Sequence, residues 1–190
     1  MSLQTVLAGI DAGWYAGGDG DGDIAHELVV RARGSALGER MLARWLLETH
    51  ATALLGPTAE REVGVVAVRW PRERLVPLTR DLGVLALAPA IRAEIGRDAV
   101  RKLKQALGNS YLLALDRGVW DGRVQADVML QMAGDLSRAM SAAREDDRHE
   151  ALYALLEHHG RCELRAWARE QQAALGEWAT LLYPAEEALA

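Results

Sequence analysis

Three aspartates alternate with glycines in the stretch GGDGDGDIAHE, residues 17–27, a pattern that invites comparison with calcium-binding loops. An EF-hand loop that opens at Asp19 places Asp21 at its third position, as calcium ligation requires. The sixth position must be glycine for the sharp turn and holds Ile24, while the twelfth must be glutamate and holds Val30. The β-roll calcium repeat needs several glycine-rich units in tandem, whereas this stretch occurs once. The spacing therefore excludes both calcium motifs.

The same stretch fits a linker better than a binding site. His26–Glu27 begins like a zinc-protease helix, but the second histidine of that motif would fall at Val30. Glycine's conformational freedom and aspartate's local hydrogen bonds favour a turn. We predict that residues 17–22 are mobile and bind no calcium, and that Asp23 caps a helix beginning near Ile24.

A second candidate for chemistry is EDDRHEALYALLEHHGRC, residues 145–162, which contains three histidines, several acids and the single cysteine of the chain. On a helix His158 and Cys162 lie four residues apart and can share a metal ion. A catalytic zinc needs a third protein ligand, and His149 lies nine residues from His158, over about 13 Å along a helix. Unless the chain folds back this geometry fails, and the acids are then typical of a solvated helix start.

The sequence contains no motif for nucleophilic catalysis or for phosphate binding. There is no Gly-x-Ser-x-Gly elbow, and the glycines of 17–22 are not followed by the Gly-Lys-Ser/Thr of a phosphate loop. Cys162 lies in an apolar pattern that favours a buried and inert thiol. We therefore predict no catalytic residues, no cofactor and no metal, which means that the chain is not an enzyme.

Two groups of basic residues remain as candidate partner-binding surfaces. Residues 92–104 carry five positive and two negative side chains, within a chain of net charge −5. Helical spacing gathers one basic group, which consists of Arg97, Arg101 and Lys104, with Lys102 beside them. The other is a stripe spaced by four residues: Arg161, Arg165 and Arg169. Each group is either a solvated face or a docking surface for an acidic region of a protein partner.

The composition of the whole chain limits the classes of protein to which it can belong. A length of 190 residues suits one domain, which can bury a core without a disulfide or metal. The single cysteine excludes an intrachain disulfide and indicates a reducing compartment. Charges interrupt every apolar run before about 18 residues, so we predict no membrane span, and the N-terminus lacks the basic region of a secretory signal. We expect a cytoplasmic protein that, being acidic, does not bind nucleic acid.

The sequence predicts that the segments carrying these candidate residues are helices. Ser35 can cap the run ALGERMLARWLLETHATALL, and Gly56–Pro57 predicts its end. Residues 63–69, VGVVAVR, remain open between strand and helix, because a short apolar run fits both. A new helix is predicted to begin at Trp70–Pro71, since proline suits a first helical position.

The centre of the chain is predicted to consist of shorter helices. Pro77 and Pro89 divide it, because proline interrupts the helical hydrogen bonds. Asp98 suits the N-cap of AVRKLKQAL, and Gly108 suits its end. Ser110, or Asn109 before it, can cap the next helix.

Two longer helical segments follow. Residues 123–143 carry an apolar stripe spaced by four residues: Val124, Val128, Met132, Leu136 and Met140. The segment from about Arg148 to Leu182 favours helix throughout, and Gly160 is predicted to break it into two helices. From these patterns we expect four side chains to be largely buried: Trp45, Leu136, Trp167 and Trp178.

Together these signals predict an all-α protein, a compact single domain of about six to eight helices joined by short links. We expect a flexible N-terminal segment at 1–23, the helical domain at 24–184 and a frayed tail at 185–190.

The central segment WPRERLVPLTRDLGVLALAPAIRAEIGRDAVRKLKQALG resembles the SctK/YscK family, accessory cytosolic proteins of bacterial type III secretion systems. The likeness covers roughly residues 70 to 110. Its matching features are Trp70–Pro71, Leu82–Gly83, Leu87-Ala88-Pro89, Ile91–Arg92 and the run from Val100-Arg101 to Leu107–Gly108.

That resemblance implies a non-enzymatic adaptor of the sorting platform beneath the secretion needle. Members of the family connect the cytoplasmic domain of the inner-membrane ring protein SctD to the pod protein SctQ, and so to the ATPase complex. It implies protein partners and a cytoplasmic location, peripheral to the inner-membrane apparatus. Two other classes stay open: a metal-dependent helical enzyme that uses the cluster at 145–162, and a small helical regulatory protein.

Overall fold

The computed structural model describes residues 9–15, 22–54, 70–119, 124–142 and 149–184. Within these ranges the chain forms helices and turns, and no strand is present. The all-α prediction is therefore confirmed. The predictions made for 17–21, 63–69, 145–148 and 185–190 lie outside the described residues.

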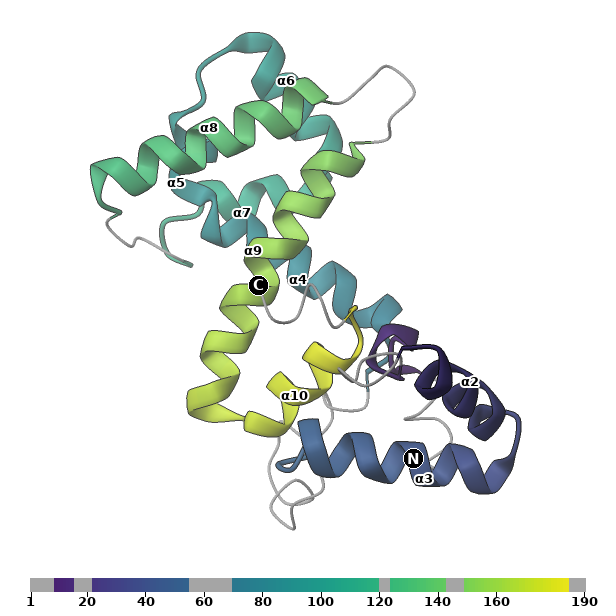
Figure 1. The fold of residues 1–190 in the computed structure, drawn as a ribbon. Coiled ribbons are helices and arrows are strands. Elements are labelled where there is room, and N and C mark those ends of the chain that lie inside the picture. The colour runs from purple at the N-terminus through teal and green to yellow at the C-terminus, as the bar shows by residue number, and fades with distance from the viewer. Residues whose placement is uncertain (1–8, 16–21, 55–69, 120–123, 143–148, 185–190) are drawn as a thin grey trace. The chain divides into compact units, whose positions relative to one another are not determined.

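Helices make up most of the described residues (Figure 1). Their bounds are Ala12–Tyr15 (η1), Gly22–Arg33 (α2), Ala36–His50 (α3), Arg72–Ala86 (α4), Ala88–Ala93 (α5), Arg97–Leu107 (α6), Gly108–Ser110 (η4), Tyr111–Leu115 (α7), Ala126–Ala142 (α8), Glu150–Gln171 (α9) and Ala173–Leu181 (α10).

The chain divides into two compact units, a division that we did not draw from the sequence. The terminal unit combines Met1–Leu75 with Arg165–Ala190, and the central unit is Val76–Leu164. Both boundaries fall inside helices, one in α4 and the other in α9. Each unit has buried apolar side chains of its own, so we describe them separately.

The core of the central unit is one cluster of apolar side chains from α4 to α9. Its buried members include Val84, Leu87, Ile91, Leu103, Tyr111, Leu136, Met140, Leu152 and Leu156. The stripe predicted for α8 is confirmed at its C-terminal end, where Leu136 and Met140 are buried, whereas Val128 is 39% exposed. Val128 lies in the first turn of α8 and is not part of the central core cluster.

Two glycines allow α4 and α9 to approach closely within this unit (Figure 1). A Cβ atom on Gly160 would lie 1.6 Å from the carbonyl oxygen of Thr79, and one on Gly83 would lie 2.0 Å from the carbonyl oxygen of Leu156. The prediction that Gly160 breaks the helix is therefore wrong. Helix α9 runs through Gly160 without interruption and ends at Gln171. Glycine is required there by the neighbouring backbone, since no side chain fits between the two helices.

Helix α4 also runs through Pro77, which we expected to divide the centre of the chain. Proline has no N–H, so the carbonyl of Glu73 loses its partner one turn later. Glu73 is exposed, and water can take the place of the missing donor there. The expected boundary at Pro89 is confirmed, because α5 begins at Ala88 with proline in its first turn.

Several predicted helix ends shift by a few residues. Helix α2 begins at Gly22, so Asp23 lies inside the helix and does not cap it. In α6 the N-cap is Gly96, and Asp98 lies in the first turn, where its charge still favours the helix dipole. Gly108 ends α6 as predicted, with a φ of 53° that suits glycine.

Two of the predicted N-cap positions are confirmed, at Ser35 and Ser110, but only Ser35 makes the capping hydrogen bond. Ser35 caps α3, because its hydroxyl accepts a hydrogen bond from the Gly38 N–H at 3.0 Å. Ser110 precedes α7 but makes no capping bond, since its hydroxyl donates to Asp81 Oδ1 at 2.6 Å. The Ser110 hydroxyl therefore bonds to a side chain distant in the sequence and not to the backbone at the start of α7.

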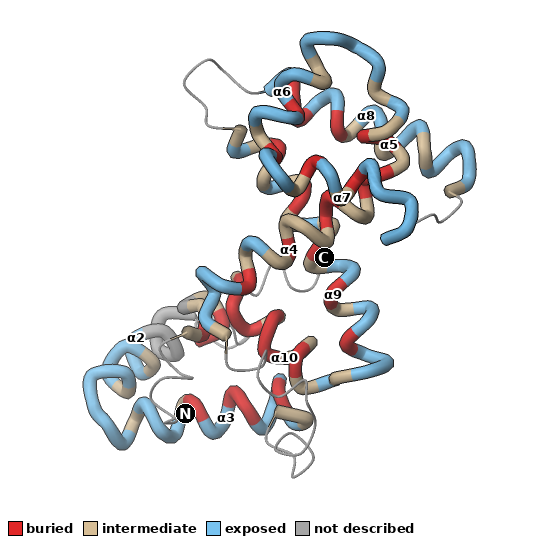
Figure 2. The backbone as a smooth tube through the Cα atoms, turned by 180° about the vertical axis from the view of Figure 1, so that it is seen from behind, coloured by how far each residue is buried: buried red, intermediate tan, exposed pale blue. Residues whose placement is uncertain are grey.

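The core of the terminal unit is built around two buried indole rings. Trp178 on α10 is 1% exposed, and its Nε1 donates to the carbonyl of Trp70 at 2.8 Å. The Nε1 of Trp14 donates to the carbonyl of Tyr183 at 2.7 Å. Both indoles thus bury their apolar rings while their polar groups find backbone partners. Figure 2 shows buried and half-buried residues along most of α10, whereas many residues of α3 are exposed.

Burial is confirmed for Leu136 and Trp178, but the same prediction is wrong for the other two tryptophans. Trp45 is 46% exposed and Trp167 is 49% exposed. On α9 the buried positions recur every four residues: Leu152, Leu156, Gly160, Leu164 and Ala168. Two of them are small residues, which an apolar pattern does not mark, and Trp167 lies beside that line.

Candidate functional site

The basic residues predicted on 97–104 share the outer surface of α6. Its inner side is fixed by Leu103 and Leu107, which are buried in the central core. The residues that we call the α6 basic face are all exposed: Arg97, Arg101, Lys102 and Lys104. Helical periodicity places them away from the leucines, so the packing of α6 itself determines which side faces solvent.

The α6 basic face has few partners within the described part of the chain. Arg101 Nη2 lies 3.3 Å from Asp98 Oδ1, one turn earlier, in a pair that is exposed on both sides. Lys104 Nζ lies 5.6 Å from the centroid of the Tyr111 ring. An exposed pair of this kind contributes about 0–1 kcal/mol, so it does little to neutralise the face. The surface therefore offers positive charge to an acidic partner.

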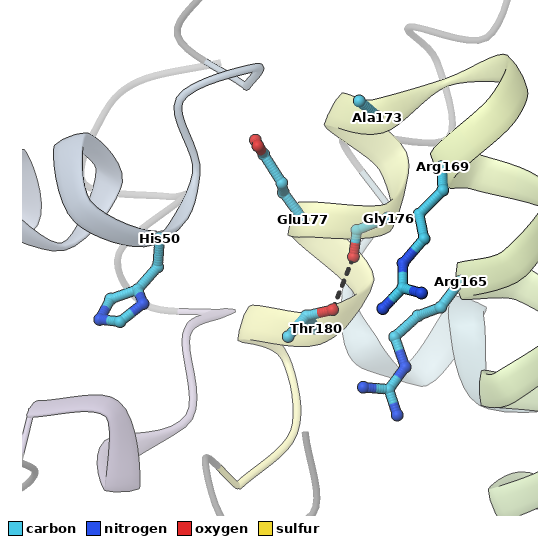
Figure 3. Close-up of a pocket in the computed structure, with 7 residues that line it drawn as sticks. All are labelled: His50, Arg165, Arg169, Ala173, Gly176, Glu177 and Thr180. Carbon is cyan, nitrogen blue, oxygen red and sulfur yellow. Dashed lines mark hydrogen bonds between the residues drawn. The ribbon is translucent and has the colours of Figure 1, made fainter. Parts of the chain in front are cut away.

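The second predicted stripe belongs to both units. All three arginines lie on α9, but Arg161 falls in the central unit and the other two in the terminal unit. The structure brings Arg165 and Arg169 together in a pocket of about 320 Å³. The pocket is lined by His50, Arg165, Arg169, Ala173, Gly176, Glu177 and Thr180 (Figure 3). Arg161 is not among these residues.

The α9–α10 turn gives this pocket its shape. Only Gln172 separates the two helices, so α10 folds back beside the last turns of α9. A Cβ atom on Gly176 would lie 3.0 Å from the Cβ of Ala168, which makes a small residue necessary at that contact. The close approach places the backbone of α10 within reach of Arg165 and Arg169 (Figure 3).

One acid lines the pocket, and backbone groups already hold it. The Glu177 carboxylate accepts hydrogen bonds from the N–H groups of Ala53 and Leu54, at 3.1 and 2.8 Å. These bonds fix the turn that follows α3, which ends at His50 and not near the expected Gly56. Figure 3 shows the carboxylate pointing away from the two guanidinium groups.

Sequence reasoning missed His50, Glu177 and Thr180 as members of a site. His50 lies more than a hundred residues before the other two in the chain, and no local motif connects it to them. His50 contacts aromatic rings on both sides, with centroid distances of 5.0 Å to Trp14 and 6.1 Å to Trp45. Only the packing of α3 against the C-terminal helices brings this histidine to the pocket.

The structure describes residues 149–162 of the second candidate cluster, all of them at the start of α9 or within it. Among the described residues, no group of three histidine, cysteine or acidic side chains is placed to hold a metal ion. Cys162, which we expected to be buried, is exposed. It lies on α9 two positions beyond the buried Gly160, so the apolar neighbours that predicted its burial belong to another side of the helix.

Burial gives one histidine of this cluster an unusual protonation equilibrium. The pKa of His159 is lowered, first by burial and then by the neighbouring His158, although Asp135 and Glu163 oppose the shift. The two imidazole rings lie 5.6 Å apart. The folded state therefore favours the neutral form of His159 relative to the unfolded chain.

This lowered pKa predicts a pH-dependent stability. Because the unfolded chain takes up a proton more readily, the free energy of unfolding should fall as the pH decreases through the ordinary histidine range, near 6.5. His159→Gln should reduce that fall between about pH 7.5 and 5.5, as measured by urea unfolding at several pH values. An equal pH dependence in wild type and His159→Gln would contradict the prediction.

Comparison with protein-family models, curated proteins and solved structures finds no match to this chain. In the part that the structure describes, no helix combines the length and the apolar character needed to cross a membrane.

Proposed function

We propose that this protein is a non-enzymatic adaptor of a bacterial type III secretion sorting platform, which links the cytoplasmic domain of SctD to SctQ. The support begins with the resemblance over residues 70 to 110, which form α4, α5 and α6. The matching residues include core members such as Leu87 and Ile91, together with the exposed Arg101. In such a role the protein would work in the cytoplasm, at the inner-membrane apparatus.

The observation that carries the proposal is the α6 basic face. It lies within the segment that carries the resemblance, and its four cations are exposed in a chain of net charge −5. Positive charge in an otherwise acidic protein steers acidic partners to that face and fixes their register. An adaptor also needs a second surface, and the terminal unit offers the pocket at Arg165 and Arg169.

The test is capture of purified SctD cytoplasmic domain and purified SctQ by this protein, and by a variant that reverses three charges. The variant combines Arg97→Glu, Arg101→Glu and Lys104→Glu. Each exposed ion pair contributes about 0.2–1 kcal/mol, so three lost pairs and the new repulsion should weaken binding about tenfold or more. Affinity is measured by calorimetry at two salt concentrations, because wild-type binding should weaken with salt.

The matched control reverses three exposed arginines on α2 and α3 of the terminal unit: Arg31→Glu, Arg40→Glu and Arg44→Glu. The net charge changes equally, so this control should bind about as well as wild type if the α6 basic face is the docking surface. Helicity and melting temperature are compared first for both variants. If neither SctD nor SctQ binds the wild-type protein, the adaptor function is wrong. If they bind and the α6 variant binds equally well, only the assignment of the face is wrong.

A further inference from the structure

We infer that the pocket between α9 and α10 binds the carboxylate side chain of an acidic segment in a protein partner. Arg165 and Arg169 lie on consecutive turns of α9, and Figure 3 shows their guanidinium groups side by side beside α10. A guanidinium presents several N–H donors in a planar fork that matches the two oxygens of a carboxylate. Two guanidinium groups in one pocket favour a planar anion such as a carboxylate over a spherical anion.

The charges around the pocket favour an anion as well. Glu177 is the acidic residue of the lining, and two backbone N–H groups already hold its carboxylate on the other side of the site. The Thr180 hydroxyl donates to the carbonyl of Gly176 at 2.8 Å (Figure 3), so it too is engaged within α10. His50 lines the pocket across from the arginines and contributes ring nitrogens. The cationic side chains therefore outnumber the acid, which faces elsewhere.

The size of the pocket argues for a segment of a protein. Its volume of about 320 Å³ is near the lower limit of typical ligand sites, and a water molecule occupies about 30 Å³. A small inorganic anion would leave most of this space to water, whereas an acidic side chain with its adjoining backbone fills more of it. Nucleic acid needs a basic track along many phosphates, which the two arginines of this pocket do not provide in an acidic chain.

Binding at this pocket does not depend on the adaptor proposal, since any partner with an exposed acidic segment satisfies it. The pocket also belongs wholly to the terminal unit, whereas the α6 basic face belongs to the central unit. The two surfaces can therefore be tested independently, and failure at one says nothing about the other.

The experiment uses a fluorescein-labelled peptide of six glutamates, with blocked termini, and follows its anisotropy at low salt. The same peptide made of glutamines is the uncharged control. The wild-type chain should bind hexaglutamate and not hexaglutamine. The double variant Arg165→Gln and Arg169→Gln should bind about tenfold or more weakly, because both forks are lost. The single variant Arg169→Gln changes an exposed residue, so it should remain folded and show a loss of about threefold or more.

The matched control carries Arg31→Gln and Arg40→Gln, the same loss of charge at exposed arginines of α2 and α3 that belong to neither basic surface. It should weaken hexaglutamate binding by less than about threefold, because exposed charges act mainly at long range. Equal losses in the two double variants would overturn the inference, since the peptide would then follow net charge alone. Displacement of the peptide by inorganic phosphate at the same concentration of charge would also overturn it, in favour of a site for small anions.

Discussion

Replacing Gly160 by alanine should destabilise the protein by about 3 kcal/mol or more, although helix propensity alone predicts a gain of about 1 kcal/mol. The added Cβ would lie 1.6 Å from the Thr79 carbonyl oxygen and 2.8 Å from the Gly83 backbone nitrogen. Backbone atoms cannot rotate away as a side chain does, so α4 and α9 would have to separate. Urea unfolding followed by far-ultraviolet circular dichroism measures the change.

A matched control for this prediction exists on α8. Gly134 is exposed and helical, and a Cβ atom built on it meets nothing within 4 Å. Gly134→Ala should therefore stabilise the protein by up to about 1 kcal/mol. Gly83→Ala should behave like Gly160→Ala, since its Cβ would lie 2.0 Å from the Leu156 carbonyl oxygen. A stabilising Gly160→Ala would mean that α4 and α9 do not cross at these glycines.

Replacing Trp178 by alanine should cost about 3–5 kcal/mol, the largest effect expected from truncation of a single side chain here. The ring is 1% exposed, and Gly9 lies against its edge, where a Cβ atom on the glycine would be 3.2 Å from the indole. The truncation also removes the indole donor from the carbonyl of Trp70. Loss of a buried hydrogen bond adds about 1 kcal/mol to the cost of the cavity.

The control is the same truncation at Trp167, which is 49% exposed on α9. Trp167→Ala should change the free energy of unfolding by less than about 1 kcal/mol, because a half-exposed ring leaves no closed cavity. Both variants are measured by thermal and urea unfolding under the same conditions. Equal costs for the two tryptophans would contradict the burial described above, and would restore the pattern-based expectation that both are core residues.

The sequence by itself determined the local features of this protein. Ser35 caps α3 and Gly108 ends α6 because both depend on neighbouring residues in the chain. The all-helical class also follows locally, from apolar spacing summed over many turns. The basic side of α6 was predictable for the same reason, since Arg101 lies two positions before Leu103 and the two side chains must point in nearly opposite directions around the helix.

Tertiary structure alone decided which face of each helix packs against another helix, and how closely the two backbones approach. The spacing of apolar residues fixes their relative angles around a helix, but it does not mark small residues as buried. Gly160 and Ala168 lie on the buried side of α9 because another helix passes close to each, and Trp167 is left beside that line. The pocket joins Arg165 to His50 across more than a hundred residues, so no local pattern could predict it. Such contacts arise from the packing of whole helices, which depends on residues distant in the chain.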